Sequence, residues 1–371
     1  MIRRFYVHNY RCLENFELPI SGQSSVLLIG KNGSGKSTVG QALWILRKVA
    51  NGINRVDKLI RPKDLVPRVR SVPVRFEIEA ALGGRVYEYI LAFELPESFK
   101  ELRVLEEKLT VDGAPVYTRE LAQVHLVRAG HGQHREPTFR VDWHLVALPI
   151  VQELSHTDPL FVFKQWLSRT LILRPLPGRI TGESNSEVQV PVPSLRNFAA
   201  WFSGLLSDAP ASYAKIDEYL RQAMSDLKSI KNPLVGKESR SIEVEFSTSQ
   251  GSITVPLQDL GDGEKCFMIG ALVLAAREAH GPMVCFWDEP ENYLALDEVA
   301  DLMLTLRRAF EPGGQLIAAS HNPEVIRAFS HENTLYFYRK SHLEPTVVRR
   351  LADLNVNGDL VSALIRGDVE P

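Results

Sequence analysis

The hydrophobic positions of this 371-residue chain change period from one region to the next. Between residues 72 and 117, apolar and polar residues alternate through PVRFEIEAAL, RVYEYILAFEL and KLTVDGAPVY, with LGGR and VDGA as turns. Alternation with period two is typical of strands, and glycine-containing turns favour hairpins. This region is therefore predicted to form an antiparallel sheet.

Both ends of the chain show short apolar runs that alternate with helical patterns. The runs are SSVLLIG (24–30), MVCFW (283–287), QLIAAS (315–320) and TLYFYR (334–339), and the helical patterns cover 37–50, 264–280 and 296–310. Such alternation indicates a parallel sheet covered on both faces. The end of the chain is thus predicted to return to the lobe that its start begins.

The middle of the chain is less regular. Residues 119–190 look loop-like apart from PLFVFKQWLSRTLIL (159–173), residues 194–229 have helical spacing, and SIEVEF (241–246) with SITVPL (252–257) reads as a hairpin. We expect three regions: a nucleotide-binding lobe with an antiparallel sheet (1–118), a mostly helical lobe (119–264), and a return to the nucleotide-binding lobe (265–371).

The composition is that of an ordinary globular protein, with 44% hydrophobic and 24% charged residues. The net charge of −2 gives no general reason to expect nucleic acid or an anionic membrane as partner. No apolar stretch approaches about 18 residues and no signal peptide is visible, so we expect a cytoplasmic protein. Cys12, Cys266 and Cys285 lack metal or CxxC spacing and are expected to be reduced thiols.

The segment GKNGSGKST, Gly30 to Thr38, matches the phosphate-loop pattern G-x-x-x-x-G-K-[ST] between a predicted strand and a predicted helix. Backbone amides of such a loop bind phosphates, Lys36 would reach the β- and γ-phosphates, and Ser37 would bind Mg²⁺. The sequence therefore predicts a site for ATP and Mg²⁺. Its nucleotide-binding residues would be Gly30, Asn32, Gly33, Ser34, Gly35, Lys36, Ser37 and Thr38.

Acidic residues follow the predicted strand in VCFWDEPEN. Ligands of open α/β sheets bind at the carboxyl ends of strands, so we expect Asp288 to hold the Mg²⁺ shell and Glu289 to orient or deprotonate the attacking water. His321 follows the next apolar strand and would emerge at the same edge, where it could hydrogen-bond the γ-phosphate. Glu289, His321 and Lys36 are the expected catalytic residues.

The four segments GKNGSGKST, LGDGEK (260–265), DEPEN (288–292) and SHNPE (320–324) have the order found in ABC-type ATPases. The opening IRRFYVHNYRCLENFEL also resembles the first strand of the RecF, SMC and OLD branch. The chain is most similar to compact ATPases of bacterial defence systems, described as AbiEii-like or OLD-like. This resemblance implies an α/β P-loop NTPase: an ABC-type ATPase head with an antiparallel β subdomain and an inserted helical lobe.

The resemblance also implies how the protein assembles. Two heads would form a homodimer or higher oligomer that binds two ATP molecules, each between one subunit's phosphate loop and the other's signature motif. Gly261, Asp262, Gly263 and Glu264 would be the signature residues at the partner's nucleotide, Arg11 would lie near the nucleotide, and NYLALD (292–297) would be the D-loop.

The sequence departs from the family pattern at two places. Gly261 replaces the serine whose hydroxyl would contact the partner's γ-phosphate, so binding across the dimer should be weaker unless backbone amides compensate. The Q-loop glutamine is not placed, since Gln152 and Gln165 both remain open.

Two weaker features have simple interpretations. The basic segment 55–70, which includes Arg61, Lys63, Arg68 and Arg70, reads as a solvated connection, with contact to DNA phosphates as the alternative. His131 and His134 in GHGQH lack a cluster of further ligands, so a loop without metal is expected.

The expected function is that of an ATPase that acts as a nucleotide-gated dimeric switch. It would regulate a separately encoded effector, a nuclease or toxin, in bacterial anti-phage defence, without a membrane partner. The alternative is a RecF-like clamp that binds DNA in an ATP-dependent way during repair. No sustained heptads separate Thr38 from Leu260, which argues against a long-armed SMC protein, and no Toprim-like acidic cluster follows His321.

Overall fold

The computed structural model describes residues 1–66, 71–97, 99–127 and 137–354. The chain forms two compact units. We call the first the antiparallel unit (Met1–Gln23, Leu28–Thr170 and His331–Pro371) and the second the parallel unit (Ser24–Leu27 and Leu171–Ser330). None of the helices in the described part is both long and apolar enough to cross a bilayer.

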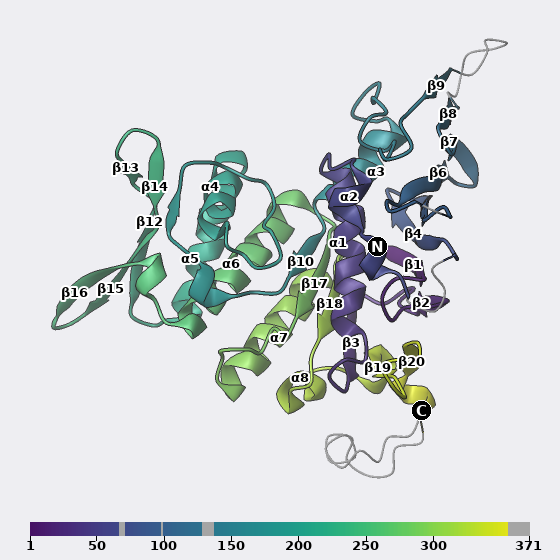
Figure 1. The fold of residues 1–371 in the computed structure, drawn as a ribbon. Coiled ribbons are helices and arrows are strands. Elements are labelled where there is room, and N and C mark those ends of the chain that lie inside the picture. Colours follow the sequence, from purple (N-terminus) through teal and green to yellow (C-terminus); the bar gives the residue numbers. More distant parts are fainter. Residues whose placement is uncertain (67–70, 98, 128–136, 355–371) are drawn as a thin grey trace. The chain divides into compact units, whose positions relative to one another are not determined.

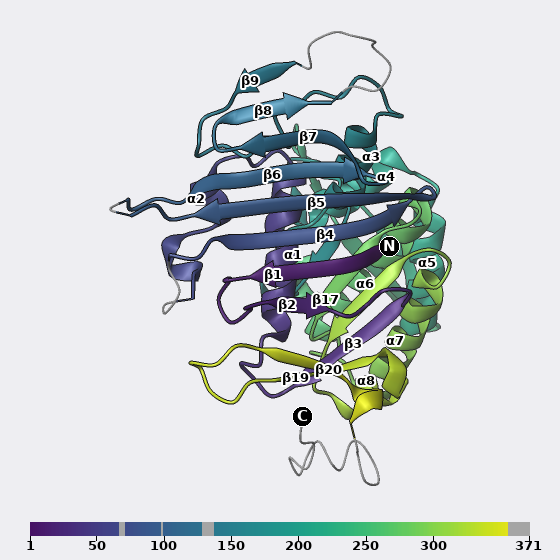
Figure 2. The same cartoon turned by 90° about the vertical axis from the view of Figure 1, so that its right-hand side faces the viewer.

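An eight-stranded sheet dominates the antiparallel unit, and Figure 2 shows its face. All neighbouring strands pair antiparallel, which confirms the sheet predicted for 72–117 and extends it on both sides. In spatial order the strands are β2 (Phe16–Leu18), β1 (Ile2–His8), β4 (Val74–Leu82), β5 (Arg85–Glu94), β6 (Arg103–Val111), β7 (Ala114–Glu120), β8 (Gln123–Leu126) and β9 (Thr138–Arg140).

Helices cover one face of this sheet (Figures 1 and 2). They are α1 (Lys36–Ala50), the short α2 (Val56–Leu59) and α3 (Pro159–Ser168), with a 3-10 turn, η1 (Pro62–Asp64). The ring of Phe163 on α3 stacks on Tyr87 with 6.2 Å between centroids and lies 5.5 Å from the ring of Tyr89. Alternating residues of β5 therefore form the surface on which α3 packs.

A buried carboxylate, Glu107 on β6, fixes the loop that follows β9 against the sheet. Its side chain is fully buried and lies 3.7 Å from the guanidinium of Arg119, which is also buried. It accepts four hydrogen bonds of 2.6–3.0 Å, from the hydroxyls of Tyr89 and Tyr117 and the amides of Ala147 and Leu148. A buried charge is tolerated because its partners replace water.

We expect Glu107→Ala to destabilise the protein by about 3–5 kcal/mol, because it leaves a buried guanidinium without its counter-ion and four buried donors without their acceptor. Glu120→Ala, at the exposed end of β7, should change the unfolding free energy by less than about 0.5 kcal/mol. Denaturant unfolding of both variants measures the difference. Equal stabilities would show that the network around Glu107 does not hold this unit together.

The antiparallel unit also contains a C-terminal hairpin. It consists of β19 (Thr334–Tyr338) and β20 (Val347–Arg350), flanked by η5 (His331–Asn333) and η6 (Leu351–Asp353). A Cβ placed on Gly30 would lie only 2.2 Å from the carbonyl oxygen of Phe337. Only glycine fits there, so the end of strand β3 (Ser25–Gly30) lies directly beside the hairpin.

In the parallel unit, three strands pair in parallel: β10 (Leu171–Leu173), β17 (Val284–Asp288) and β18 (Gln315–Ala319). All their residues are buried, as the continuous apolar runs predict. The amide of Leu316 on β18 donates to the carbonyl of Ser24 at 2.8 Å. Strand β3 is therefore divided, with its first residues in the parallel unit and its last in the antiparallel unit.

Helices and small sheets complete the parallel unit (Figure 1). The helices predicted for 264–280 and 296–310 are confirmed as α6 and α7, and the hairpin predicted for 241–257 is confirmed as β15 and β16. The helices are α4 (Phe198–Asp208), α5 (Ser212–Ala223), α6 (Asp262–His280), α7 (Leu296–Phe310) and α8 (Pro323–Arg327), with turns η3 (Pro177–Arg179) and η4 (Leu257–Asp259). The small sheets are β12 (Leu227–Lys231), β15 (Glu243–Thr248) and β16 (Gly251–Pro256), and β11 (Glu183–Ser184), β14 (Ser239–Ser241) and β13 (Leu234–Val235).

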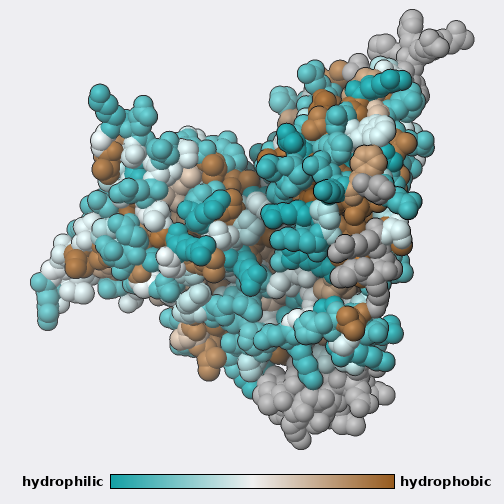
Figure 3. All heavy atoms as spheres, in the orientation of Figure 1, coloured by the Kyte–Doolittle hydropathy of each residue, from teal (hydrophilic) through white to brown (hydrophobic). Residues whose placement is uncertain are grey.

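The small sheets carry a few exposed apolar side chains. Leu234, Val235 and Ile253, on β13 and β16, are exposed. On the face in Figure 3, hydrophobic residues lie in scattered spots among hydrophilic ones. Scattered apolar residues of this kind are normal on protein surfaces. They do not form a continuous patch on the face shown.

Residues 119–264 contain more strand than the sequence suggested. Strands β8 and β9 extend the large antiparallel sheet, and six short strands lie between residues 183 and 256. Five of these eight strands, β8, β9, β11, β13 and β14, are two to four residues long, too short for a period of two to stand out. The compact units change at Gln23/Ser24, Leu27/Leu28, Thr170/Leu171 and Ser330/His331. These boundaries do not test the division at 118 and 264, which follows the motifs and stays a prediction.

Candidate functional site

The phosphate loop lies in the antiparallel unit between the end of β3 and the start of α1. Gly33 and Gly35 have φ values of +81° and +107°, in the left-handed region that favours glycine. A Cβ on Gly35 would also lie 2.5 Å from the hydroxyl of Thr346. The glycines of the motif are thus required both by backbone conformation and by close packing.

Lys36 is buried and its ammonium lies inside this loop. Its Nζ donates to the carbonyl of Gly30 at 2.6 Å and to that of Lys31 at 3.4 Å. Helix α1 has no acidic residue in its first turn, so its amides offer an uncompensated positive end. Ser37 and Thr38 form that first turn, whereas Asn32 and Gly33 are exposed at the tip of the loop. This donor set fits a polyphosphate.

Arg11, the arginine implied by the family resemblance, is held beside α1. Its Nη2 lies 2.9 Å from Asp64 Oδ1, and its Nη1 donates to Gln41 on α1. Its backbone has a φ of +55°, and its amide donates to the carbonyl of Asp64 at 2.7 Å. The structure therefore places Arg11 next to the helix that follows the phosphate loop, within the same unit.

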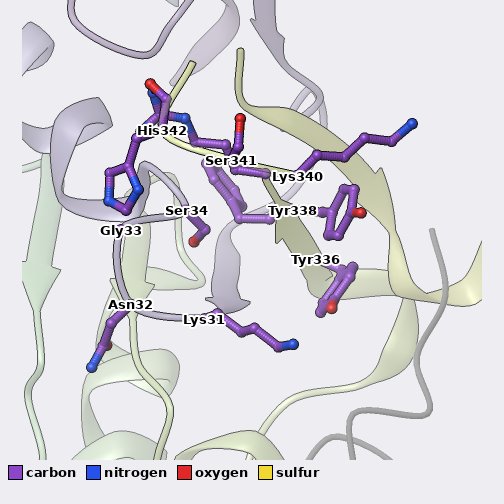
Figure 4. Close-up of a pocket in the computed structure, with 11 residues that line it drawn as sticks. Lys31, Asn32, Gly33, Ser34, Tyr336, Tyr338, Lys340, Ser341 and His342 are labelled. Atoms are coloured by element: carbon purple, nitrogen blue, oxygen red, sulfur yellow. The ribbon is translucent and has the colours of Figure 1, made fainter. Parts of the chain in front are cut away.

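A cavity of about 140 Å³ lies beside the phosphate loop (Figure 4). One wall is the loop from Lys31 to Ser34, and the other is the hairpin segment from Tyr336 to His342. Just beyond this segment, Thr346 donates its hydroxyl to the carbonyl of Ser34 at 2.8 Å and its amide to the carbonyl of Cys12 at 2.9 Å. The hairpin thus supports the phosphate loop from behind, a contact that no local sequence pattern indicates.

We expect Thr346→Val to weaken ATP binding about 2–10-fold, because it keeps the side-chain shape but leaves the buried carbonyl of Ser34 without its donor. Equilibrium titration with a fluorescent ATP analogue measures this change. Thr248→Val, at the exposed end of β15, is the matched control and should bind ATP normally. Unchanged affinity in Thr346→Val would show that the loop does not need this hydrogen bond.

In the parallel unit, Asp288, Glu289 and His321 lie together at the carboxyl edge of β17 and β18. Asp288 is the buried last residue of β17. The next residue, Glu289, has a left-handed backbone with a φ of +55°, and its amide donates to the carbonyl of Ala319 at 2.8 Å. Glu289 Oε1 lies 4.0 Å from His321 Nδ1. Asn292 Nδ2 donates to Glu289 Oε2 at 2.8 Å, which orients this carboxylate.

Arg174 is a residue at this edge that the sequence analysis missed. It follows β10, and its Nε lies 3.6 Å from Asp288 Oδ2. Gln152 and Gln165, the open candidates for the Q-loop, both belong to the antiparallel unit, and Gln165 lies on α3. The signal that could have found Arg174 is the apolar run LIL directly before it, which marks a third buried strand.

Glu291 connects the turn after β17 with the turn after β18. Its side chain is buried and accepts a hydrogen bond of 2.5 Å from the hydroxyl of Ser320, which in turn accepts from the amide of Asn322 at 2.9 Å. Burial raises the pKa of the Glu291 carboxyl, and the hydrogen bond from Ser320 opposes this shift. The two turns that carry Glu289 and His321 are thus fastened to each other.

The signature segment LGDGEK forms the start of α6 in the same unit. Glu264 accepts a hydrogen bond from the amide of Gly261 at 2.6 Å and so closes the first turn. A Cβ on Gly263 would lie 2.9 Å from the carbonyl of Tyr293, and Cys266 Sγ lies 3.6 Å from the carbonyl of Asn292. The D-loop segment therefore packs against the first turn of α6, which contains Asp262 and Gly263.

Several residues considered from sequence fall outside the site or outside the described residues. His131, His134, Arg68 and Arg70 belong to the segments 128–136 and 67–70, which the structure does not describe. Within residues 1–66, 71–97, 99–127 and 137–354, no group of three His, Cys, Asp or Glu side chains could hold a metal ion. Cys12, Cys266 and Cys285 are buried free thiols, and burial raises the pKa of Cys266 to about 12.

The phosphate loop, the parallel strands with their acidic carboxyl edge, and the antiparallel sheet are the parts of a P-loop ATPase fold. Two family models match the chain: "AAA ATPase domain" over residues 1–106, and "AAA domain, putative AbiEii toxin, Type IV TA system" over residues 162–327. Both descriptions name AAA, and together the matched ranges include the phosphate loop, the signature segment, the acidic edge and His321.

Solved structures of SMC heads share the fold. An SMC head bound to the C-terminal winged-helix domain of ScpA has a TM-score of 0.51 and 14% identity, covering 95% of this chain and 98% of that chain. An SMC head with an extended coiled coil, bound to the C-terminal domain of ScpA derived from Pyrococcus furiosus, has a TM-score of 0.51 and 12% identity, covering 95% and 96%. At such identities the likeness concerns the fold alone.

A curated relative is the zinc import ATP-binding protein ZnuC 1 of Hahella chejuensis. It is 29% identical over 120 residues, which are 32% of this chain and 44% of that protein. The chain thus spans less than half of this relative. Taken with the family models and the SMC heads, the match supports an ABC-type ATPase with an SMC-like fold.

Proposed function

We propose that the protein hydrolyses ATP with Mg²⁺ and uses the nucleotide state as a switch. The observation that carries this proposal is the arrangement of Glu289, held by Asn292 and 4.0 Å from His321, directly after Asp288. A carboxylate next to a metal-binding aspartate is suited to orient or deprotonate a water. A chain that only bound nucleotide would not need this second carboxylate.

Each side chain has a role that its chemistry supports. Lys36 and the loop amides would bind the phosphates, and Ser37 with Asp288 would hold Mg²⁺, which neutralises phosphate charge when bound. Glu289 would act on the attacking water, and His321 would contact the terminal phosphate. Arg11, positioned beside α1, would lie near the nucleotide.

We further propose a dimer in which each signature segment completes the partner's ATP site. The first turn of α6 supports this, since the amides around Gly261, Asp262, Gly263 and Glu264 begin a long helix whose N-terminal end attracts phosphate. The D-loop follows the acidic edge in the sequence and packs on this turn. A conformational change at the acidic edge would therefore be transmitted through the D-loop to the proposed dimer interface, within one unit.

The biological role we propose is regulation of a separate effector, a nuclease or toxin, in bacterial anti-phage defence. The match to a model whose description names an AbiEii toxin and a type IV toxin–antitoxin system supports this role. The alternative is an ATP-dependent DNA clamp of RecF type in repair, which the likeness to SMC heads supports to the same degree. The basic residues Arg61 and Lys63 in the described part of segment 55–70 belong to that alternative.

We expect Glu289→Gln to bind ATP normally, to lose at least about 100-fold in hydrolysis rate, and to accumulate as an ATP-dependent dimer, because it keeps the shape but not the basicity of the carboxylate. Light scattering coupled to size-exclusion chromatography measures the dimer. Lys36→Ala should fail to dimerise because it does not retain ATP. A variant Glu289→Gln that stays monomeric with ATP at high concentration would rule out the sandwich.

The same trapped dimer separates the two biological roles. Tight, ATP-dependent binding of duplex or gapped DNA at low salt, lost on charge reversal of Arg61 and Lys63, would favour the clamp. Copurification of the dimer with a nuclease or toxin that it inhibits or activates would favour the regulator of an effector.

Gly261→Ser tests whether the missing signature hydroxyl limits dimer closure. Gly261 has a φ of −59° and a ψ of 152°, a backbone conformation open to serine. An added Cβ would lie 3.1 Å from Glu264 Oε2, so this flexible side chain must shift by a few tenths of an ångström. We expect a several-fold rise in ATP-dependent dimerisation or in hydrolysis rate, because a hydrogen bond to a charged phosphate is gained. Gly178→Ser, in exposed η3 with no neighbour within 4 Å of an added Cβ, is the control. No change in Gly261→Ser would mean that backbone amides already suffice.

A further inference from the structure

We propose that Arg174 is a catalytic residue of this ATPase. Its guanidinium lies beside Asp288, and it would contact the terminal phosphate of a bound nucleoside triphosphate. This inference rests on the proposed function, because it assigns a further residue to the same acidic edge. Arg174 lies outside the phosphate loop, the signature segment and the segments DEPEN and SHNPE.

The position of Arg174 follows from the strand register. Leu171, Ile172 and Leu173 of β10 pair in parallel with Cys285, Phe286 and Trp287 of β17. The next residue on each strand is Arg174 on one and Asp288 on the other, so the two side chains emerge from the same edge of the sheet. Parallel strands place their carboxyl ends together, and this is where ligands of such sheets bind.

Arg174 combines a hydrogen-bonded backbone with an exposed side chain. Its amide donates to the carbonyl of Pro193 at 2.7 Å, and the three residues before it are buried. Its side chain is 63% exposed, and its Nε lies 3.6 Å from Oδ2 of the buried Asp288. This separation is longer than a hydrogen bond. The pairing is therefore easily exchanged for a stronger one.

The guanidinium of Arg174 would offset negative charge at this edge when a nucleotide binds. Asp288 and Glu289 are two neighbouring acidic side chains, and His321 Nδ1 lies 4.0 Å from Glu289 Oε1. A triphosphate adds further negative charge, which a nearby cation must offset. An arginine offers planar, paired donors that match phosphate oxygens, and it stays charged at any working pH.

The chain provides a matched control in Arg179. It lies five residues further on, in η3 of the same unit, and is exposed. Replacing it removes the same charge from the same segment without touching Asp288. A purely electrostatic or folding effect would appear in both variants, whereas a contact with the terminal phosphate would appear only in Arg174→Ala.

The test measures ATP and ADP affinities by isothermal titration calorimetry with Mg²⁺, in the Glu289→Gln background, so that no hydrolysis intervenes. We expect Arg174→Ala to lose about 10–100-fold in ATP affinity with ADP affinity unchanged, since a charge-assisted hydrogen bond to the terminal phosphate is lost. Arg174→Lys should show an intermediate loss, and Arg179→Ala none. Melting temperatures establish that the variants fold.

Equal losses for ATP and ADP, no loss, or the same loss in Arg179→Ala would overturn the role of Arg174. The hydrolysis rate of the unmodified protein is measured separately. If that protein binds ATP through Arg174 but does not hydrolyse it, the proposed ATPase activity fails while the contact with the terminal phosphate stands. If the unmodified protein hydrolyses ATP but Arg174→Ala still binds ATP as well as the parent protein does, the ATPase activity stands and the contact of Arg174 with the terminal phosphate fails.

Discussion

The parallel pairing of β10, β17 and β18 is the constraint on which the acidic edge depends. Because the three strands run in the same direction, the residues that follow them meet at one edge, although they are far apart in the sequence. Asp288 and Arg174 come into contact in this way, and so do Glu289 and the turn that carries His321. Glu291 and Ser320 then fasten the turns together.

The sequence predicted those parts of the site whose chemistry is local. The phosphate loop is a continuous motif with glycines demanded by its own backbone, and Asp288 and Glu289 follow a recognisable buried strand. Arg174 and Thr346 could not be predicted in this way. Each of them contacts a residue more than 100 positions away in the sequence, and no local sequence pattern identifies that contacting residue.

The same distinction applies to the fold. The hydrophobic pattern of the sequence predicts long alternating strands such as β4 to β7 and strongly apolar elements such as β17, β18 and α6. Strands of two to four residues, such as β8, β9 and β13, are too short to show a period and exist because a neighbouring strand supplies their hydrogen bonds. The Q-loop glutamine could not be placed from the sequence either, because no long periodic element marks its position.

The division of β3 has a consequence for how this protein can be built. The chain passes from one unit to the other four times, and residues 24–27 belong to the parallel unit while the residues on either side do not. Neither unit is an uninterrupted stretch of polypeptide, so neither can be expressed as a simple fragment or exchanged by a single recombination event. Each must close long loops before its sheet is complete, which makes assembly slow and cooperative.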